Sequence, residues 1–281
     1  MSLSLIRTLT AGITAGFVLS GCAEMTDAEK NADLGPINAI DSTGLNDIML
    51  NLADPAEAVK FFSESLAAEP DRVDLKKNLA TALVNNNQYA EAALVYEQLI
   101  DEGNADNDDR LAYADALIRN GAWEEAEKQL NAIPPTVETF DRYFLEALMA
   151  DHNKDWAKAD NFYDIARGLT TRPAQVLNNW GISKADRGQF DDAEKLFKQA
   201  ISADPKMFTA KNNLVITLGK QRIYSLPIIP MTDKERAILM YNLAREAIQN
   251  GDIDVARGLL ANAIDTHPQH FEPAVALLAS L

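Results

Sequence analysis

The fold is most clearly encoded in residues 174–207, which read AQVLNNWGISKADRGQFDDAEKLFKQAISADPKM. Two apolar blocks with helical spacing predict two helices that run antiparallel. Gly188 marks the turn between them, and Pro205 ends the second helix because proline lacks a backbone donor and clashes with the preceding turn. Small residues at Gly181 and Ala193 allow the two helices to approach closely.

The same pattern recurs along most of the chain. Alanines equivalent to Ala193 return with a period of about 34 residues, and the six positions are Ala58, Ala92, Ala126, Ala159, Ala193 and Ala256. Only the last interval is longer, at nearly twice the period. A single helix pair cannot bury its apolar face alone, so stacked neighbours must supply the core. The sequence therefore predicts an all-α repeat architecture.

This repeat resembles the tetratricopeptide repeat (TPR) family over roughly residues 39–270. The resemblance implies a right-handed superhelix, an α-solenoid of antiparallel helix pairs with a concave face lined by the first helix of each pair. We expect about six units within residues 45–281, with a degenerate first unit and a short capping helix at 271–281.

One unit departs from the pattern. Residues 208–222 fit a first helix, but residues 224–231 replace the second helix with an apolar loop that contains Pro227 and Pro230. Two prolines this close restrict the backbone to extended or polyproline conformations. A new helix is expected to begin at Thr232. The loop either packs over the solenoid in place of the missing helix or docks a partner, and both interpretations remain open.

Charge and cysteine content exclude several classes of function. The chain has 26 Lys and Arg against 42 Asp and Glu, a formal net charge of -16 that disfavours nucleic acid and anionic membrane surfaces. One cysteine and three histidines argue against a disulfide framework or a metal site. No nucleophile elbow or phosphate-binding glycine loop is present. We expect a protein that is not an enzyme and has no cofactor, metal or small-molecule substrate.

The first residues have the features of a processing signal. The apolar stretch of residues 9–19 is too short to span a bilayer, and it ends in Leu19-Ser20-Gly21-Cys22, which contains the sole cysteine. This ending resembles the lipobox of bacterial lipoproteins. The resemblance implies removal of residues 1–21, acylation of Cys22 with fatty acids such as palmitate, and a flexible tether at 22–44. Ala23 after the cysteine implies sorting to the outer membrane, with the folded body facing the periplasm.

Asparagines recur at one position of the first helices, which is unusual because asparagine is a mediocre helix former. Equivalent positions hold Asn78, Asn179, Asn213 and Asn242. An amide can donate to and accept from an extended peptide backbone, and some TPR proteins hold a peptide in this way. We therefore predict a peptide-binding groove formed by Asn178, Asn179, Asn212, Asn213, Tyr241, Asn242 and Arg245. The alternative is that these amides bond to the neighbouring helix.

The chain resembles the TadD-like lipoproteins of Flp (tight-adherence, Tad) pilus assembly in its lipobox at Cys22, its repeat count, the insertion at 224–227 and the tail at 263–271. The resemblance implies a non-enzymatic adaptor that supports assembly of the pilus secretion apparatus, with a segment of a secretin or another pilus component as partner. The alternative is a generic periplasmic scaffold for outer-membrane barrel assembly or cell-wall enzymes.

Overall fold

The computed structural model describes residues 44–281 of the chain. The chain divides into two compact units, Met1–Ile48 and Met49–Leu281. Of the first unit the structure describes residues 44–48, which contain the beginning of α3 (Leu45–Asn51). The predicted signal at 1–21, the acylation site at Cys22 and nearly all of the predicted tether lie outside the described residues.

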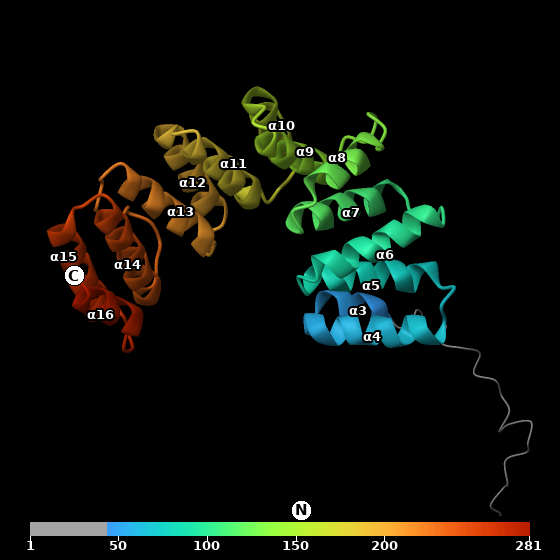
Figure 1. Cartoon of the computed structure of the whole chain (residues 1–281), viewed down its shortest axis with the longest axis horizontal. Helices are drawn as coiled ribbons and strands as arrows, with labels where there is room; N and C mark the ends of the chain where they lie inside the picture. Colours follow the sequence, from blue (N-terminus) through green and yellow to red (C-terminus); the bar gives the residue numbers. More distant parts are fainter. Residues whose placement is uncertain (1–43) are drawn as a thin grey trace, which may run out of the picture. The chain divides into compact units, whose positions relative to one another are not determined.

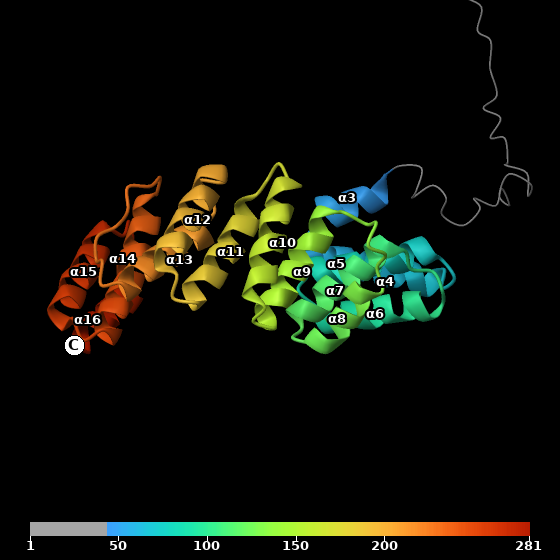
Figure 2. The same ribbon diagram turned by 90° about the horizontal axis from the view of Figure 1, so that it is seen from above.

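Every regular element within residues 44–281 is an α-helix, and helices of the second unit lie side by side in chain order (Figure 1). Each helix packs mainly against the helices that precede and follow it, as the view from above also shows for α10 to α15 (Figure 2). This finding confirms the predicted all-α solenoid of helix pairs. After α3 the helices are α4 (Pro55–Ala68), α5 (Val73–Asn85), α6 (Tyr89–Asp101), α7 (Asn107–Arg119), α8 (Trp123–Asn131), α9 (Phe140–His152), α10 (Trp156–Gly168), α11 (Ala174–Asp186), α12 (Phe190–Ala203), α13 (Phe208–Lys220), α14 (Asp233–Gln249), α15 (Ile253–Thr266) and α16 (Glu272–Ala279).

One backbone conformation recurs in the turns that follow the first helices α5, α7, α9, α11, α13 and α14. At this turn one residue has a positive φ between 59° and 82°, a region that favours glycine because a Cβ atom is crowded there. Three of the turns contain glycine and three contain a larger residue, namely Asn87, Gly121, Lys154, Gly188, Arg222 and Gly251. The repeat thus fixes the turn geometry even where the local residue is poorly suited to it.

Small residues at the helix crossings are fully enclosed. The alanines Ala92, Ala126, Ala159, Ala193 and Ala256 of the second helices all have 0% exposure. On the first helices, Gly181 faces Phe197 so closely that a Cβ added to the glycine would lie 2.6 Å from the ring. Close approach of the two backbones therefore depends on the small residues that the repeat pattern placed there.

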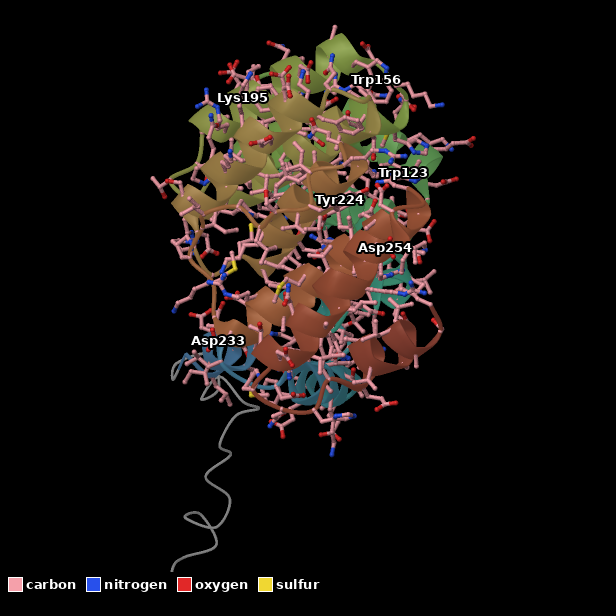
Figure 3. The ribbon with its side chains drawn as sticks, turned by 90° about the vertical axis from the view of Figure 1, so that its left-hand side faces the viewer. Trp123, Trp156, Lys195, Tyr224, Asp233 and Asp254 are labelled. Carbon is pink, nitrogen blue, oxygen red and sulfur yellow. The ribbon has the colours of Figure 1, made fainter. Side chains whose placement is uncertain are left out.

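Residues 221–232 connect α13 to α14 without a helix. Tyr224, Leu226 and Met231 pack against the buried cluster that includes Val215 and Leu243, and Tyr224 is marked in Figure 3. The Tyr224 hydroxyl also donates to Asp252 at 2.5 Å. These loop side chains cover the surface of α13 that a second helix covers in the other repeats.

Part of this loop remains outside the core. Ile229 packs against the cluster around α12 and α13, whereas Ile228 is fully exposed. Together with α12 the loop borders an open groove of about 820 Å³.

The helices α13 and α14 are in direct contact. A Cβ added to Gly219 of α13 would lie 2.6 Å from the Cβ of Glu246 on α14. Thr232 caps α14 through the capping box with Glu235 that its sequence favours. At the C-terminal end of the chain, α16 packs on α15. Among the residues that the structure describes, no helix is long and apolar enough to span a membrane.

Candidate protein-interaction groove

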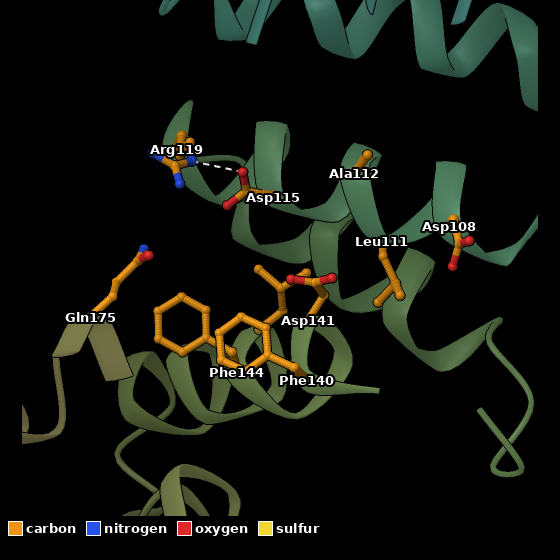
Figure 4. Close-up of a pocket in the computed structure, with 10 residues that line it drawn as sticks. Asp108, Leu111, Ala112, Asp115, Arg119, Phe140, Asp141, Phe144 and Gln175 are labelled. Carbon is orange, nitrogen blue, oxygen red and sulfur yellow. Dashed lines mark hydrogen bonds and ion pairs between the residues drawn. The ribbon is translucent and has the colours of Figure 1, made fainter. Parts of the chain in front are cut away.

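A pocket of about 410 Å³ lies along the first helices α7 and α9 and reaches the start of α11 (Figure 4). Acidic and aromatic side chains share its lining. The residues that line it are Asp108, Leu111, Ala112, Asp115, Arg119, Phe140, Asp141, Phe144, Leu145 and Gln175. Since all of these residues come from first helices, the pocket lies on the surface for which the repeat pattern predicts partner binding.

One side of this pocket is aromatic and the other carries an ion pair. The rings of Phe140 and Phe144 stack with centroids 5.6 Å apart and planes 10° apart. On α7, Arg119 Nε donates to Asp115 Oδ2 at 2.8 Å. Burial, followed by the charges of Asp115 and Asp108, raises the pKa of Asp141. The pocket is therefore electronegative with an apolar wall.

The pocket residues occupy equivalent repeat positions. Asp108, Asp141 and Gln175 follow one another at the repeat period of about 34 residues, and Asn179 lies one turn after Gln175. Phe144 occupies the repeat position that Asn178 and Asn212 occupy in later units. Asp108, Asp141 and the two phenylalanines were not predicted, because no single residue type recurs at their positions. The repeat positions alone, regardless of residue type, mark them as residues of the first-helix surface.

The predicted asparagines form bonds between neighbouring first helices. The side chain of Asn213 donates to Oδ1 of the buried Asn178 at 3.0 Å, which joins α13 to α11. Asn242 donates to Asn212 Oδ1 at 2.6 Å, which joins α14 to α13. Asn179 donates to the carbonyl of Gln175 on its own helix at 3.0 Å. Four of the five asparagines therefore form two rungs, each with one hydrogen bond between two amides, and Asn179 belongs to neither rung.

Two other predicted residues occupy different surroundings. Arg245 is exposed and lines a pocket of about 280 Å³ together with Asn212 and Asn242. Tyr241 packs against Phe271, with ring centroids 5.5 Å apart, beside the final helix. Arg245 thus lies beside the Asn212–Asn242 rung, while the ring of Tyr241 packs near the C-terminal end of the solenoid.

A separate polar network links α10 to α11. Asp160 accepts hydrogen bonds from Trp180 Nε1 at 2.7 Å, Lys184 Nζ at 2.8 Å and Arg187 Nη2 at 2.7 Å. Burial alone would raise the pKa of Asp160, but the bonds from Arg187, Lys184 and Trp180 outweigh it and lower that pKa to about 2. All three donors are fixed by the neighbouring helix and its end, so this carboxylate has a structural role.

Asp151 extends this network from α9. Its carboxylate accepts from Ser183 at 2.5 Å and from Tyr163 at 2.8 Å. Burial raises the pKa of Asp151, although the bonds from Ser183 and Tyr163 oppose the shift. Within residues 44–281, no group of three His, Cys, Asp or Glu side chains has the geometry to hold a metal ion.

Stacked helix pairs with a groove along their first helices define a helical-repeat scaffold. Models of the tetratricopeptide repeat family match residues 50–109, 86–151 and 178–218, which together make up just over half of the chain. The chain belongs to the tetratricopeptide repeat family. Proteins built from these repeats typically bind protein partners and are non-catalytic scaffolds.

Solved structures share the fold at low sequence identity. A tetratricopeptide repeat protein from Parabacteroides merdae is 15% identical with a TM-score of 0.54, over 85% of this chain and 96% of that one. PilW, a type IV pilus biogenesis factor, is 18% identical with a TM-score of 0.52, over 73% and 98%. The APC/C heterotetramer Cut9–Hcn1 is 12% identical with a TM-score of 0.59, over 84% of this chain but 47% of that one, so the chain spans about half of its length. No curated protein matches the chain significantly.

Proposed function

We propose that the protein is a non-enzymatic adaptor whose first-helix groove binds a segment of a protein partner during pilus assembly. The observation that carries this proposal is the pocket along α7, α9 and α11, which exposes the polar side chains of Asp108, Asp141 and Gln175 at equivalent repeat positions. Exposed side chains at such positions serve neither the core nor the turns of the repeat. They are available to a partner that lies along the first helices.

The asparagine rungs support binding of a polypeptide main chain. A side-chain amide has two N–H groups and an oxygen with two lone pairs, and each rung uses one donor and one acceptor. Asn179, Asn212, Asn213 and Asn242 all remain partly exposed. The remaining donors and acceptors can therefore pair with backbone groups of an extended segment.

A lipid anchor at Cys22 would concentrate the adaptor on the membrane where its partners assemble. With several acyl chains the attachment would be firm, and tethering raises the effective concentration for partners on the same membrane. We infer that the anchored form faces the periplasm from the outer membrane. We further propose a TadD-like role, in which a secretin or another component of the Flp pilus apparatus is bound. PilW, a type IV pilus biogenesis factor, has a similar fold, which is compatible with such a role.

The proposal is tested by capture of partners from solubilised envelopes with the full chain as bait. Asn179→Ala combined with Asn213→Ala should reduce recovery of secretin or pilus components severalfold, because two contacts to a bound main chain are lost. The matched control is Asn161→Ala with Asn262→Ala, two exposed asparagines on the second helices α10 and α15. If the folded Asn179→Ala, Asn213→Ala variant captured as much partner as the unmodified chain, binding of a peptide by the asparagines would be refuted. Capture of barrel-assembly factors or cell-wall enzymes in place of pilus components would support a generic scaffold.

A further inference from the structure

The pocket between α7 and α9 has an unbalanced charge. Three carboxylates line it, but among the described residues Arg119 is the one cation in its lining, and Arg119 pairs with Asp115. Within residues 44–281, the side chains of Asp108 and Asp141 take part in no hydrogen bond or ion pair. Two negative charges therefore face the pocket without a cationic side chain paired to them.

The wall next to Asp141 is aromatic. Phe140 and Phe144 stack one helical turn apart on α9, and Figure 4 shows both rings beside Asp141 on the α9 side of the pocket. Phe144 is buried, whereas Phe140 is half-buried. The face of an aromatic ring attracts cations, and a planar guanidinium can stack on it. The pocket thus combines a partly exposed ring with carboxylates.

The protein holds its own arginines with the same combination of groups. Arg119 pairs with Asp115 and lies 5.6 Å from the ring centroid of Tyr89. Another guanidinium, that of Arg187, is bound by Asp160 and lies 5.2 Å from the ring of Trp156. In both cases one carboxylate and one aromatic ring hold one guanidinium.

We propose that the α7–α9 pocket receives the guanidinium of an arginine in the partner segment, between the carboxylates of Asp108 and Asp141 and against the ring of Phe140. This inference rests on the proposed function, because the arginine belongs to the segment that the groove binds. Arginine fits better than lysine, since its flat group can stack on the ring and pair with a carboxylate at once. An acidic side chain would be repelled by the two carboxylates that lack a cationic partner.

Two small probes test this pocket without a partner protein. N-acetyl-L-arginine methylamide and its neutral isostere N-acetyl-L-citrulline methylamide are titrated into the full chain, and backbone amide shifts are followed by NMR. The arginine probe should shift the amides around Asp141 and Phe144 and bind about fivefold more tightly than the citrulline probe, the size of one exposed charge pair. Equal affinity for the two probes would overturn the proposal.

A pocket variant and a surface control variant complete the experiment. Asp108→Asn with Asp141→Asn should abolish the preference for arginine. Asp254→Asn removes a charge from a carboxylate on α15 that is 99% exposed, and it should keep the preference (Figure 3). An unchanged preference in the pocket variant, with its helicity intact, also overturns the proposal. The probes need no partner protein. If the full chain captured no partner but still preferred the arginine probe, the proposed function would be refuted and the arginine pocket would stand.

Discussion

Gly181 lies directly against the edge of the Phe197 ring at the centre of the α11–α12 pair. A Cβ on Gly181 would lie 2.6 Å from Cε1 of the ring, closer than carbon atoms approach in folded proteins. Other first helices carry alanine at this position, including Ala80, Ala114 and Ala147. The phenylalanine therefore occupies the space that a methyl group fills in those repeats.

Replacing Gly181 by alanine should destabilise the protein despite the higher helix propensity of alanine. Overpacking of a fixed ring costs about 1–3 kcal/mol, which outweighs a gain of about 1 kcal/mol from propensity. The control is Gly258→Ala on α15, where an added Cβ meets no atom within 4 Å and should stabilise. Urea denaturation of both variants measures the difference, and equal shifts in the two midpoints would refute the packing argument.

Asp160 should stabilise the protein at neutral pH and lose this effect in acid. Its folded-state pKa of about 2 lies below the unfolded value of 3.8, so its contribution is present above about pH 4 and disappears as the pH falls toward 2. Asp160→Asn should cost about 1–2 kcal/mol at pH 7 after allowance for solvent screening. The difference in unfolding free energy between the two proteins should be the same at pH 7 and pH 5 and smaller at pH 3. A constant difference would contradict the linkage.

Lys154→Gly should stabilise the turn between α9 and α10. Lys154 has a φ of 59°, a left-handed conformation that costs a residue with a Cβ about 1 kcal/mol. The reverse change at the equivalent turn, Gly188→Lys, should destabilise by a similar amount. Thermal unfolding followed by circular dichroism would show opposite shifts in Tm, and shifts of the same sign would contradict the turn assignment.

The two isoleucines of the inserted loop should differ in their contribution to stability. Ile229→Ala removes a side chain that packs on the α12–α13 cluster and should cost about 1 kcal/mol. Ile228 is fully exposed, so Ile228→Ala should change the unfolding free energy by less than about 0.5 kcal/mol. The denaturant midpoints of the Ile229→Ala and Ile228→Ala variants measure this difference. A large loss at Ile228 would mean that the loop packs differently.

Cys22→Ser should leave folding intact and release the protein from membranes. The thiol is the acceptor for acylation in the lipobox interpretation, and the serine variant lacks it. Sucrose-gradient fractionation and far-UV circular dichroism measure the two effects. Retention of the serine variant in the outer membrane would refute the lipid-anchor prediction.

Sequence periodicity was sufficient to predict the helix pairs. The enclosed alanines and the close approach of Gly181 follow directly from a residue pattern that repeats with a regular period. The asparagines lie along the first helices, as their register requires. Their pairing across helices depends on the lateral spacing of α11, α13 and α14, which no single sequence expresses.

Other features depend on which side chains meet between neighbouring helices. Trp180 and Lys184 converge on Asp160 from the following helix, and no repeat position marks that carboxylate. Tyr241 shares its repeat position with Asn178, yet its ring packs against Phe271 because α14 is followed by α15 and the final helix. The position of a residue in the repeat predicts which face of the helix it lies on, whereas the neighbouring helices determine which side chains it contacts.

The extended segment after α13 also accounts for the one irregular interval in the alanine series. A helix advances about 1.5 Å per residue and an extended chain about 3.3 Å. An extended segment therefore returns the chain to the start of the next first helix with fewer residues than a second helix does. From Val215 to Ala244 the chain uses fewer residues than the roughly 34 of an ordinary unit. The long interval between Ala193 and Ala256 is thus one ordinary period and one shortened period. The spacing of the first helices is therefore set by the length of the path between them and not by the number of residues in it.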